Sequence, residues 1–526
     1  MSLPRVISET LGGSPLSVAA QRAELSPWYV PRPTGAAGWR VYLRQLVREP
    51  ANKTWLRELA PAFDARGKAA EQLRRVFEGN GAVISTGQQA ALFGGPLYTL
   101  TKAVSVLAFA DVLERGTSIP IAPVFWAATD DADFEEAASA HVAVIGEIRT
   151  FRLQNPEQAG VAMNDVPMPG VEPLIERLAD ACGSVIEPSV LDDVRDCYTS
   201  RATLGAAYVR QLRRLLEPLG IAVIDASHPA LRIAAAPVLR RALERAVAVE
   251  QALRQRSDAI RAAGYAPQVD HLPALSLVFS ATPGEPKTRI PVADALSMAG
   301  RAPETLGPNV LLRPIVERFI MPSAAYVAGP GETAYFAQVS AVAEALDLPT
   351  PLPIPRWSAT IIEPRVERVL TRLGISREEL RDRHALETKL ARQALPSTIS
   401  QTLQRLRHQI GADVAALEVI DRDKLIPPAS LQGLRRSLLH RVERTERRYV
   451  AAVKRRETEL MRDIGTAAAA LYPGGERQER VLNFVPFIAR YGKSLIDQMT
   501  VEAERHAMFA LGTAAPDLTV PVAERV

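Results

Sequence analysis

Short and almost uniformly apolar runs recur along the first two thirds of the chain, and each leads into a polar turn. The runs cover 82–84, 119–128, 220–225 and 321–328. Uninterrupted apolar runs are typical of strands that are buried on both faces of a parallel sheet. Helical patterns follow the turns at 97–113, 231–263 and 333–346. Repeated strand, turn and helix units predict an α/β fold with a doubly wound parallel sheet.

Other patterns surround this predicted core. Residues 1–78 carry apolar side chains at helical spacing, interrupted by Pro50 and Pro61, and are predicted to form a helical lead-in. Two regions are rich in proline and irregular in pattern, at 140–200 and 265–312. We expect these regions to be insertions that form small satellite domains.

The region after residue 362 is helical and highly charged. One arm covers 377–418, Pro427-Pro428 interrupts it, and a second arm covers 430–471. Heptad spacing in the second arm slips by one residue after Ala452 and then resumes. The apolar seam comprises Leu438, Val442, Thr445, Tyr449 and Ala452, then Val453, Leu460, Ile464, Ala467 and Leu471. The pattern predicts an antiparallel helical hairpin.

Composition narrows the class of protein. The chain has 526 residues, of which 47% are hydrophobic, as in ordinary globular proteins. Its two cysteines, Cys182 and Cys197, cannot build a disulfide framework, and no Cys-x-x-Cys pair offers a structural zinc site. No stretch approaches about 18 apolar residues, and the first residues lack the apolar core of a secretion signal. We therefore expect a cytoplasmic protein with no membrane association.

The net charge of +4 is too small for this length to indicate a nucleic-acid-binding protein. Arginines are dense between 431 and 462, but they alternate with glutamates and with few aromatic residues. This interleaving favours a solvated helix with many salt bridges over a nucleic-acid surface.

Candidate chemistry gathers in the turns. Ligands of open parallel sheets bind outside the carboxyl ends of the strands, where successive turns converge. The turns at 85–89, 129–136, 227–228 and 329–332 supply hydroxyls, amides, carboxylates and one imidazole. We expect these turns to form one polar site.

The first turn could bind an anion, because it precedes the N-terminus of a helix. Its candidate residues are Ser85, Thr86, Gly87, Gln88 and Gln89. The sequence matches neither G-x-G-x-x-G nor the Walker pattern, so a tight packing turn is the alternative. Lys102, in the following helix, could reach the same anion or could be a surface lysine.

The acidic run 130–136 could bind a cationic amine or Mg²⁺, or exchange protons. In an extended segment Asp131 and Asp133 share a face. Alternatively, a helix begins at Phe134 and the acidic residues are favourable at its N-terminus. His228 follows the third strand and is either a structural or a catalytic histidine, with no identifiable nucleophile partner.

The last strand unit offers further candidates. Arg313 precedes a proline and is therefore predicted to be extended, where it could clamp a carboxylate or form a structural ion pair. Gly331 and Glu332 belong to the turn at 329–332, and Tyr335 follows it. This tyrosine could equally be a core aromatic residue.

Four motifs in fixed order resemble one family. They are STGQQAALFGGPLYTLTKA, PVFWAATDDADFEE, NVLLRPIVERFIMPSAAYVAGPGETAYFAQ and ERQERVLNFVPFIARYG. The chain resembles the cysteine-adding enzymes of bacillithiol biosynthesis over nearly its whole length. The resemblance implies a Rossmann-like core with two inserted connecting-peptide domains and a C-terminal coiled coil that forms a homodimer. The implied divisions are 1–139, 201–264 and 313–362 for the core, 140–200 and 265–312 for the inserts, 363–473 for the coiled coil, and 474–526 for a segment that returns to the core.

The resemblance also implies a reaction, in which the carboxyl of cysteine is joined to the amine of glucosaminyl-malate. Asp131 and Asp133 would then bind the amine or act as base, with His228 as a further catalytic candidate. Arg313 would hold a malate carboxylate. The substrate-binding candidates are Ser85, Thr86, Gly87, Gln88, Gln89, Lys102, Arg313, Gly331, Glu332 and Tyr335. No resident metal is implied, and the cofactor stays open, with ATP and Mg²⁺ as the candidate, because neither a HIGH-type nor a KMSKS-type motif is present.

The sequence departs from the family pattern at the acidic run. Relatives commonly carry Glu-Asp-His-Asp where this chain has Asp130-Asp131-Ala132-Asp133. No imidazole is available at Ala132, and His141 could replace it only if the following segment folds back. Ala91 and Glu317 also differ from the expected glycine and glutamine. An enzyme that activates an amino acid for another amine, or a coiled-coil scaffold without catalysis, are the alternative hypotheses.

Overall fold

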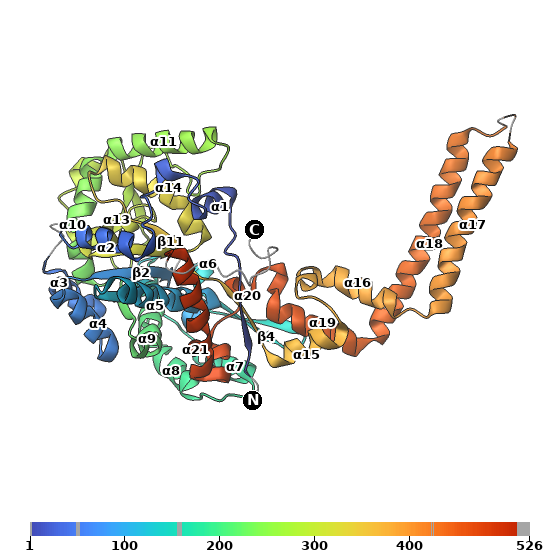
Figure 1. Cartoon of the computed structure of the whole chain (residues 1–526), viewed down its shortest axis with the longest axis horizontal. Helices are drawn as coiled ribbons and strands as arrows, with labels where there is room; N and C mark the ends of the chain where they lie inside the picture. The colour runs from blue at the N-terminus through green and yellow to red at the C-terminus, as the bar shows by residue number, and fades with distance from the viewer. Residues whose placement is uncertain (1–2, 49–52, 155–159, 422, 424, 513–526) are drawn as a thin grey trace. The chain divides into compact units, whose positions relative to one another are not determined.

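A computed structural model describes residues 3–48, 53–154, 160–421, 423 and 425–512 (Figure 1). Pro50 and residues 513–526, which enter the sequence predictions above, lie outside the described residues. The chain divides into two units. We call them the α/β unit, comprising Met1–Val142, Arg149–Ile362 and Gln478–Val526, and the helical unit, comprising Ala143–Ile148 and Glu363–Arg477.

A five-stranded, fully parallel sheet forms the centre of the α/β unit. In spatial order its strands are β6 (Ala222–Asp225), β3 (Ile121–Ala128), β2 (Ala82–Gln89), β10 (Ser323–Ala328) and β11 (Pro353–Pro355). Numbered along the chain this order is 3-2-1-4-5, so the direction of winding reverses between β2 and β10. That reversal is the switch point at which doubly wound folds bind ligands. The predicted fold class is confirmed.

Helices cover both faces of the sheet (Figure 1). On one side, α5 (Leu97–Thr117) packs on β2 and β3, and α21 (Val485–Ala510) packs on α5. On the other side lie α13 (Arg313–Ile320) and α14 (Pro330–Ala345). Because α5 and α14 are buried along most of their surface, they lack the polar stripe of a surface helix.

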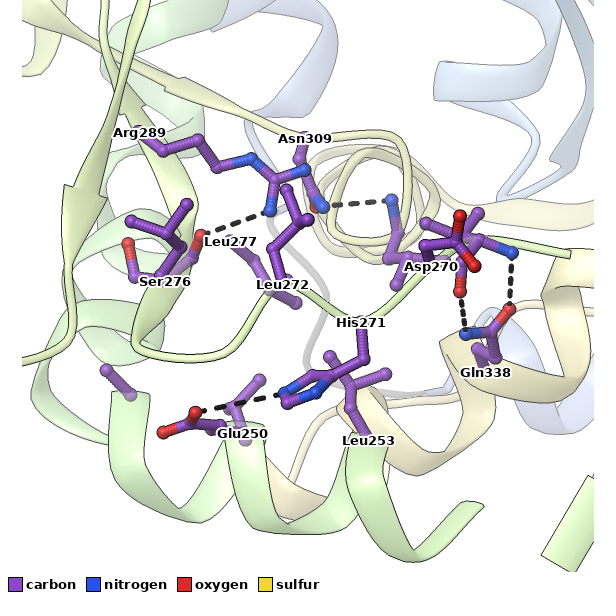
Figure 2. A pocket seen from close by; sticks show the side chains of 15 residues that line it. Glu250, Leu253, Asp270, His271, Leu272, Ser276, Leu277, Arg289, Asn309 and Gln338 are labelled. Atoms are coloured by element: carbon purple, nitrogen blue, oxygen red, sulfur yellow. Dashed lines mark hydrogen bonds and ion pairs between the residues drawn. The ribbon is translucent and has the colours of Figure 1, made fainter. Parts of the chain in front are cut away.

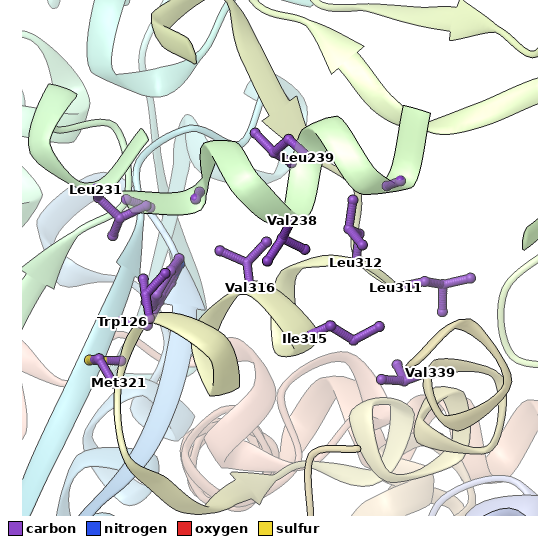
Figure 3. Packing of buried hydrophobic residues seen from close by; sticks show 14 of the residues in the cluster. Trp126, Leu231, Val238, Leu239, Leu311, Leu312, Ile315, Val316, Met321 and Val339 are labelled. Carbon is purple, nitrogen blue, oxygen red and sulfur yellow. The ribbon is translucent and has the colours of Figure 1, made fainter. Parts of the chain in front are cut away.

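A large apolar cluster fixes the second of these faces. Figure 3 shows Trp126 of β3 among side chains of α10 (Pro229–Glu244) and α13. Leu231, Val238 and Val316 of this cluster are all at least nine-tenths buried. Fully burying one such side chain contributes about 1.5–3 kcal/mol, so the cluster anchors the helices that flank the switch point.

The inserted regions contain their own elements. Between β3 and β6 lie α6 (Phe134–Ala137), β4 (Ser139–Val144), β5 (Glu147–Arg152), α7 (Glu172–Cys182), α8 (Ser189–Cys197) and α9 (Leu204–Leu216). Between β6 and β10 the chain forms a three-stranded antiparallel sheet in the order β8 (Thr288–Pro291), β7 (Leu275–Ser280) and β9 (Leu306–Pro308). The boundaries expected for two connecting-peptide domains stay a prediction.

Several local predictions are corrected. The strand β2 continues through 85–89, because its residues pair with β3 as far as Gln89, so the predicted turn is strand. The helix predicted at 231–263 is two helices, α10 and α11 (Ala246–Ala262), separated at Arg245. Arg313 begins a helix instead of lying in an extended segment. The Asn309 side chain accepts hydrogen bonds from the N–H groups of residues 311 and 312 and starts that turn, and proline is tolerated in a first helical turn.

The remaining elements of the α/β unit complete its surface. They are β1 (Arg5–Ser8), α1 (Pro15–Gln21), α2 (Gly35–Leu46), α3 (Trp55–Phe63), α4 (Gly67–Glu78), α12 (Ala295–Met298), β12 (Ala359–Ile362) and α20 (Gln478–Val481). The strand β1 pairs antiparallel with β12. Across the described residues, none of the helices combines the length and apolar character that crossing a membrane would require.

The helical unit contains the predicted hairpin. Its helices are α15 (Pro364–Leu373), α16 (Arg383–Gln393), α17 (Ser397–Ile420), α18 (Pro428–Arg456) and α19 (Thr458–Leu471). The first arm is broken before α17 and the second at Glu457, a few residues after the predicted register slip. Ion pairs connect α18 with its neighbours, since its Glu446 pairs with Arg392 of α16 and Arg407 of α17.

The predicted apolar seam is only partly confirmed: Val453, Ile464, Ala467 and Leu471 of its second half are buried, but its first half differs. Val450 and Val453 are buried against Ala391 and Leu395 of the neighbouring segment. Tyr449 is 42% exposed, because the packed face of α18 is rotated by one residue from the predicted heptad.

Candidate functional site

A cavity of about 650 Å³ lies at the carboxyl ends of β2, β3 and β10, at the switch point of the sheet. This volume is typical of small-molecule sites. Residues from the end of β2 and from the predicted turns after β3 and β10 line it, together with residues of α5, α13, α14 and the β7–β8–β9 sheet. Turns that are far apart in the sequence therefore meet at one place.

Many of the predicted site residues line this cavity. They are Gly87, Gln88, Gln89, Lys102, Asp131, Arg313, Gly331, Glu332 and Tyr335. Their common position makes them candidates for one site, and their individual roles stay predictions.

Four predicted residues lie elsewhere, each for a local reason. Ser85 and Thr86 are inside the buried part of β2, where Ser85 donates to Glu317 and Thr86 to the carbonyl of Val327. The Asp133 carboxylate caps α6 by accepting the N–H of residue 136. His228 caps α10, since its Nδ1 accepts the N–H of residue 230. Thr86, Asp133 and His228 bond to the backbone and Ser85 to a buried carboxylate, and none of the four lines the cavity.

A buried ion pair organises the side of the cavity formed by α5 and α14. The Lys102 ammonium donates to the carbonyl of Gly87 at 2.7 Å and to Oε1 of Gln88 at 3.0 Å, and lies 2.9 Å from the Glu332 carboxylate. These partners match the three hydrogens of the ammonium. The alternative of a surface lysine is wrong, because Lys102 is 5% exposed.

Glu332 accepts from three directions. Besides Lys102, the Tyr326 hydroxyl and the Gly329 N–H donate to its carboxylate, both at 2.6 Å. Burial alone would raise the pKa of Glu332, but Lys102 and these donors outweigh it, so the pKa lies below its usual range. Burial lowers the pKa of Lys102, with Glu332 opposing the shift. The pair holds the start of α14 against the end of β2.

Arg313 is fixed by a second buried network. Its guanidinium donates to Glu317 at 3.0 Å and to the Tyr335 hydroxyl at 3.2 Å, and lies 4.8 Å from the centre of the Tyr326 ring. Glu317 is 2% exposed, and burial raises its pKa to about 7 despite Arg313. The departure from the expected glutamine thus places an ionisable group directly behind the predicted carboxylate clamp.

The acidic turn contributes Asp130, Asp131 and Ala132 to the cavity. The Asp131 carboxylate accepts from the Gln89 side chain at 2.7 Å. Burial is the largest influence on Asp131 and raises its pKa, which makes it a stronger base than an exposed aspartate. His141 does not fold back to the cavity, and its Nδ1 lies 3.0 Å from the hydroxyl of Thr150.

The last motif closes the site from behind. Glu479 forms a bidentate pair with Arg356 at 2.7 and 2.9 Å, and both are nine-tenths buried. Asn483 donates to the carbonyls of Phe93 and Gly95. Gly94 has a φ of +81°, and a Cβ there would come within 2.3 Å of the Phe484 ring. The close packing of Asn483 and Phe484 therefore requires glycine at position 94.

Sequence reasoning missed several lining residues, above all Lys287 and Arg289 of the 265–312 insert. The insert had no motif that connects it with the sheet, although Lys287 and Arg289 stand two residues apart, as side chains on one face of a strand do. The cavity is lined by more cations than carboxylates, the cations being Lys102, Lys287, Arg289, Arg313, Arg356 and Arg480, and the carboxylates Asp130, Asp131 and Glu332. Such a lining favours an anionic ligand.

Comparison with known families agrees with both units. Residues 19–357 match the family model "Bacillithiol biosynthesis BshC, N-terminal Rossmann-like domain", and residues 359–509 match "Bacillithiol biosynthesis BshC, C-terminal coiled-coil domain". The chain belongs to the BshC family. The predicted resemblance is confirmed, and so are the Rossmann-like and coiled-coil parts.

Curated relatives cover most of the chain. It is 30% identical over 455 residues to "Putative cysteine ligase BshC" of Salinibacter ruber, covering 81% of this chain and 80% of that protein. It is also 30% identical over 476 residues to the protein of the same name from Koribacter versatilis, covering 85% and 86%. The relative from Solibacter usitatus is 29% identical over 487 residues, covering 86% and 89%.

Proposed function

We propose that this BshC-family protein is a cysteine ligase that joins the carboxyl of cysteine to the amine of glucosaminyl-malate. The observation that carries the proposal is the switch-point cavity, in which Asp131 and an excess of cations face one space. The cations suit the malate carboxylates, and Asp131 suits the amine. The names of the curated relatives support the same reaction class.

Amide formation requires two events at the cysteine carboxyl. The carboxyl oxygen must first become a leaving group, because a carboxylate does not react with an amine at neutral pH. The amine nitrogen then attacks the acyl carbon, the leaving group departs with its electron pair, and the nitrogen loses a proton. Asp131 takes that proton in our proposal, since it lines the cavity and burial raises its pKa.

An adenine nucleotide with Mg²⁺ would supply the activation of the carboxyl. The N-terminus of α14, where Pro330 and Gly331 line the cavity, suits its phosphates, and Arg480 lies on the same lining. Within the described residues, no three His, Cys, Asp or Glu side chains are grouped to hold a metal ion. Mg²⁺ commonly binds through phosphates and one or two carboxylates, of which Asp130 would provide one.

The test is product formation by the purified protein. Cysteine, glucosaminyl-malate and ATP are incubated with it, and mass spectrometry follows the amide. Asp131→Asn should lower kcat about 100-fold, within the range for loss of a general base. Asp133→Asn is the matched control, because its side chain lies outside the cavity, and it should keep wild-type activity.

Other outcomes select the alternatives. Cysteine-dependent pyrophosphate exchange without amide product would indicate activation for another amine. Wild-type thiol levels in cells that carry only the Asp131→Asn variant would favour a non-catalytic scaffold.

We also propose a homodimer formed through the helical hairpin. Large apolar side chains are exposed on α17 and α18, among them Leu406, Leu417, Leu434 and Tyr449. Light scattering of Leu434→Lys/Tyr449→Lys should give the monomer mass, whereas Val247→Lys, an exposed position on α11, should keep the dimer. A dimer that survives the double change would contradict this interface.

A further inference from the structure

The three-stranded β7–β8–β9 sheet brings an aromatic ring and two cations to the cavity. Phe279 of β7, Lys287 and Arg289 all line it. The Lys287 ammonium lies 5.0 Å, and the Arg289 guanidinium carbon 5.1 Å, from the centre of the Phe279 ring. One ring therefore supports both charges, which limits their freedom to leave the cavity.

Arg289 differs from the other half-buried or buried arginines of the cavity. Arg313 is paired with Glu317, and Arg356 with Glu479. For Arg289, the described residues place no carboxylate at ion-pair distance, and its one protein acceptor is the carbonyl of Ser276 at 3.4 Å. Burial lowers its pKa with no opposing carboxylate. A guanidinium has five N–H donors, so most of those on Arg289 have no protein acceptor among the described residues.

Asn309 adds a second donor without an acceptor. Its Oδ1 accepts the backbone N–H groups of residues 311 and 312, which fixes the orientation of the amide. Its Nδ2 is buried and has no hydrogen-bond partner. Figure 2 shows Arg289 and Asn309 at a small cavity of about 20 Å³ that they line in addition to the large one. Donors without acceptors on this wall indicate an anion as the missing partner.

The position of Lys287 connects this wall with the acidic turn. Its ammonium donates to the carbonyl of Asp130 at 2.6 Å and lies 3.8 Å from the Asp130 carboxylate. Asp130 precedes Asp131, and Lys287 lies two residues before Arg289 in sequence. A ligand whose anion pairs with Arg289 would therefore have its neighbouring group close to Asp131.

We infer that Arg289, supported by Lys287 and Phe279, forms the subsite for the malate carboxylates of the amine substrate. This inference rests on the proposed function. The cysteine carboxyl reacts and loses its charge, so an arginine that stays paired throughout the reaction must bind carboxylates of the other substrate. In glucosaminyl-malate the amine and the malate are attached to adjacent carbons of the sugar, which fits an anion subsite beside the acidic turn. A nucleotide phosphate would not need to lie beside the acidic turn in this way.

The test compares acceptors with and without malate. Arg289→Met keeps an apolar stem over Phe279 and removes the charge, and the exposed Arg301→Ala on the same insert is the matched control for charge. For glucosaminyl-malate, Arg289→Met should raise KM 10- to 100-fold, as expected for loss of a charged hydrogen bond. For methyl glucosaminide, which lacks carboxylates, and for cysteine, KM should change less than twofold. Arg301→Ala should leave all three values unchanged.

Calorimetry separates this inference from the proposed function. L-Malate should bind the wild-type protein and Arg301→Ala, but bind Arg289→Met at least tenfold more weakly. Malate binding that depends on Arg289, without any amide product, would contradict the proposed ligase and leave the subsite standing. Three results for Arg289→Met would each overturn the subsite. They are an equal rise in KM for glucosaminyl-malate and methyl glucosaminide, unchanged binding of malate, and weaker binding of AMP instead of malate. Arg289→Gln, which also removes the charge, supplies the same comparison should Arg289→Met fail to fold.

Discussion

The walls of the cavity hold their charges in two different ways. On the side of α5, α13 and α14, each buried cation has a carboxylate partner: Lys102 with Glu332, and Arg313 with Glu317. On the side of the β7–β8–β9 sheet, Lys287 lies 3.8 Å from the Asp130 carboxylate, but Arg289 has no carboxylate partner among the described residues. Paired buried charges are costly to separate and hold the shape of a site. An unpaired one is available to a ligand, so the first wall supports the cavity and the second binds.

The largest expected effect comes from breaking a buried pair behind the first wall. Glu479→Gln leaves the buried Arg356 without its counter-charge, which should lower the free energy of unfolding by about 3–5 kcal/mol. Urea denaturation measures this change. Glu78→Gln, in an exposed pair with Arg74, should cost less than about 1 kcal/mol. Equal losses of unfolding free energy in the two variants would contradict the expectation that breaking a buried ion pair costs more than breaking an exposed one.

The next effect depends on pH. The pKa of Glu317, about 7 in the folded protein, lies above the ordinary value of 4.5, so between these values the folded chain holds a proton that the unfolded chain has lost. Its contribution to stability is present below pH 4.5 and is lost as the pH rises to 7. Relative to Glu317→Gln, the wild type should lose about 3 kcal/mol across this range. Parallel stability curves for the two proteins, measured by urea unfolding, would contradict the raised pKa.

A smaller effect concerns activity. Lys102→Met removes the largest influence that lowers the pKa of Glu332 and frees the amide of Gln88. The value of kcat/KM should fall about 100-fold, or about 2.7 kcal/mol in activation free energy. The acidic limb of the pH profile of kcat/KM should also move to higher pH, because without Lys102 the pKa of Glu332 rises. The pH profile of kcat/KM distinguishes this from simple loss of folded protein, which would lower the rate equally at every pH.

The smallest expected effect is on stability at the second wall. Arg289→Met breaks no ion pair and loses mainly the contact of the guanidinium with Phe279, so the free energy of unfolding should change by less than about 1 kcal/mol. Thermal and urea unfolding check this value. A loss comparable with that of Glu479→Gln would mean that Arg289 supports the fold, and the contrast between the walls would disappear.

Much of the core was predictable because it is encoded locally. The runs at 119–128 and 321–328 are apolar on both faces, and only a sheet covered by helices buries such strands. The meeting of Gly87, Asp131 and Gly331 at one cavity followed from the rule for switch points. The boundaries were less predictable: Ser85 and Thr86 are polar and suggested a turn, yet they are strand residues because buried partners accept their hydroxyls.

The roles of single polar residues were the least predictable. Asp131 and Asp133 are equivalent in the sequence, but one accepts from Gln89 at the cavity while the other caps α6. Local spacing does not predict which of the two carboxylates accepts a hydrogen bond from a backbone N–H. Arg289 and Lys287 were missed for a related reason, because nothing in the insert shows that it folds back onto the sheet.

The sequence by itself determined the class of fold, the order of its strands along the chain and membership of the BshC family, since hydrophobic periodicity and ordered motifs are local properties. Only the tertiary structure decided which charges are paired and which remain available. Pairing depends on distances between residues such as Lys102 and Glu332, or Arg356 and Glu479, that are more than one hundred positions apart in the chain. Burial then sets the strength of each electrostatic interaction, because charges interact more strongly away from water.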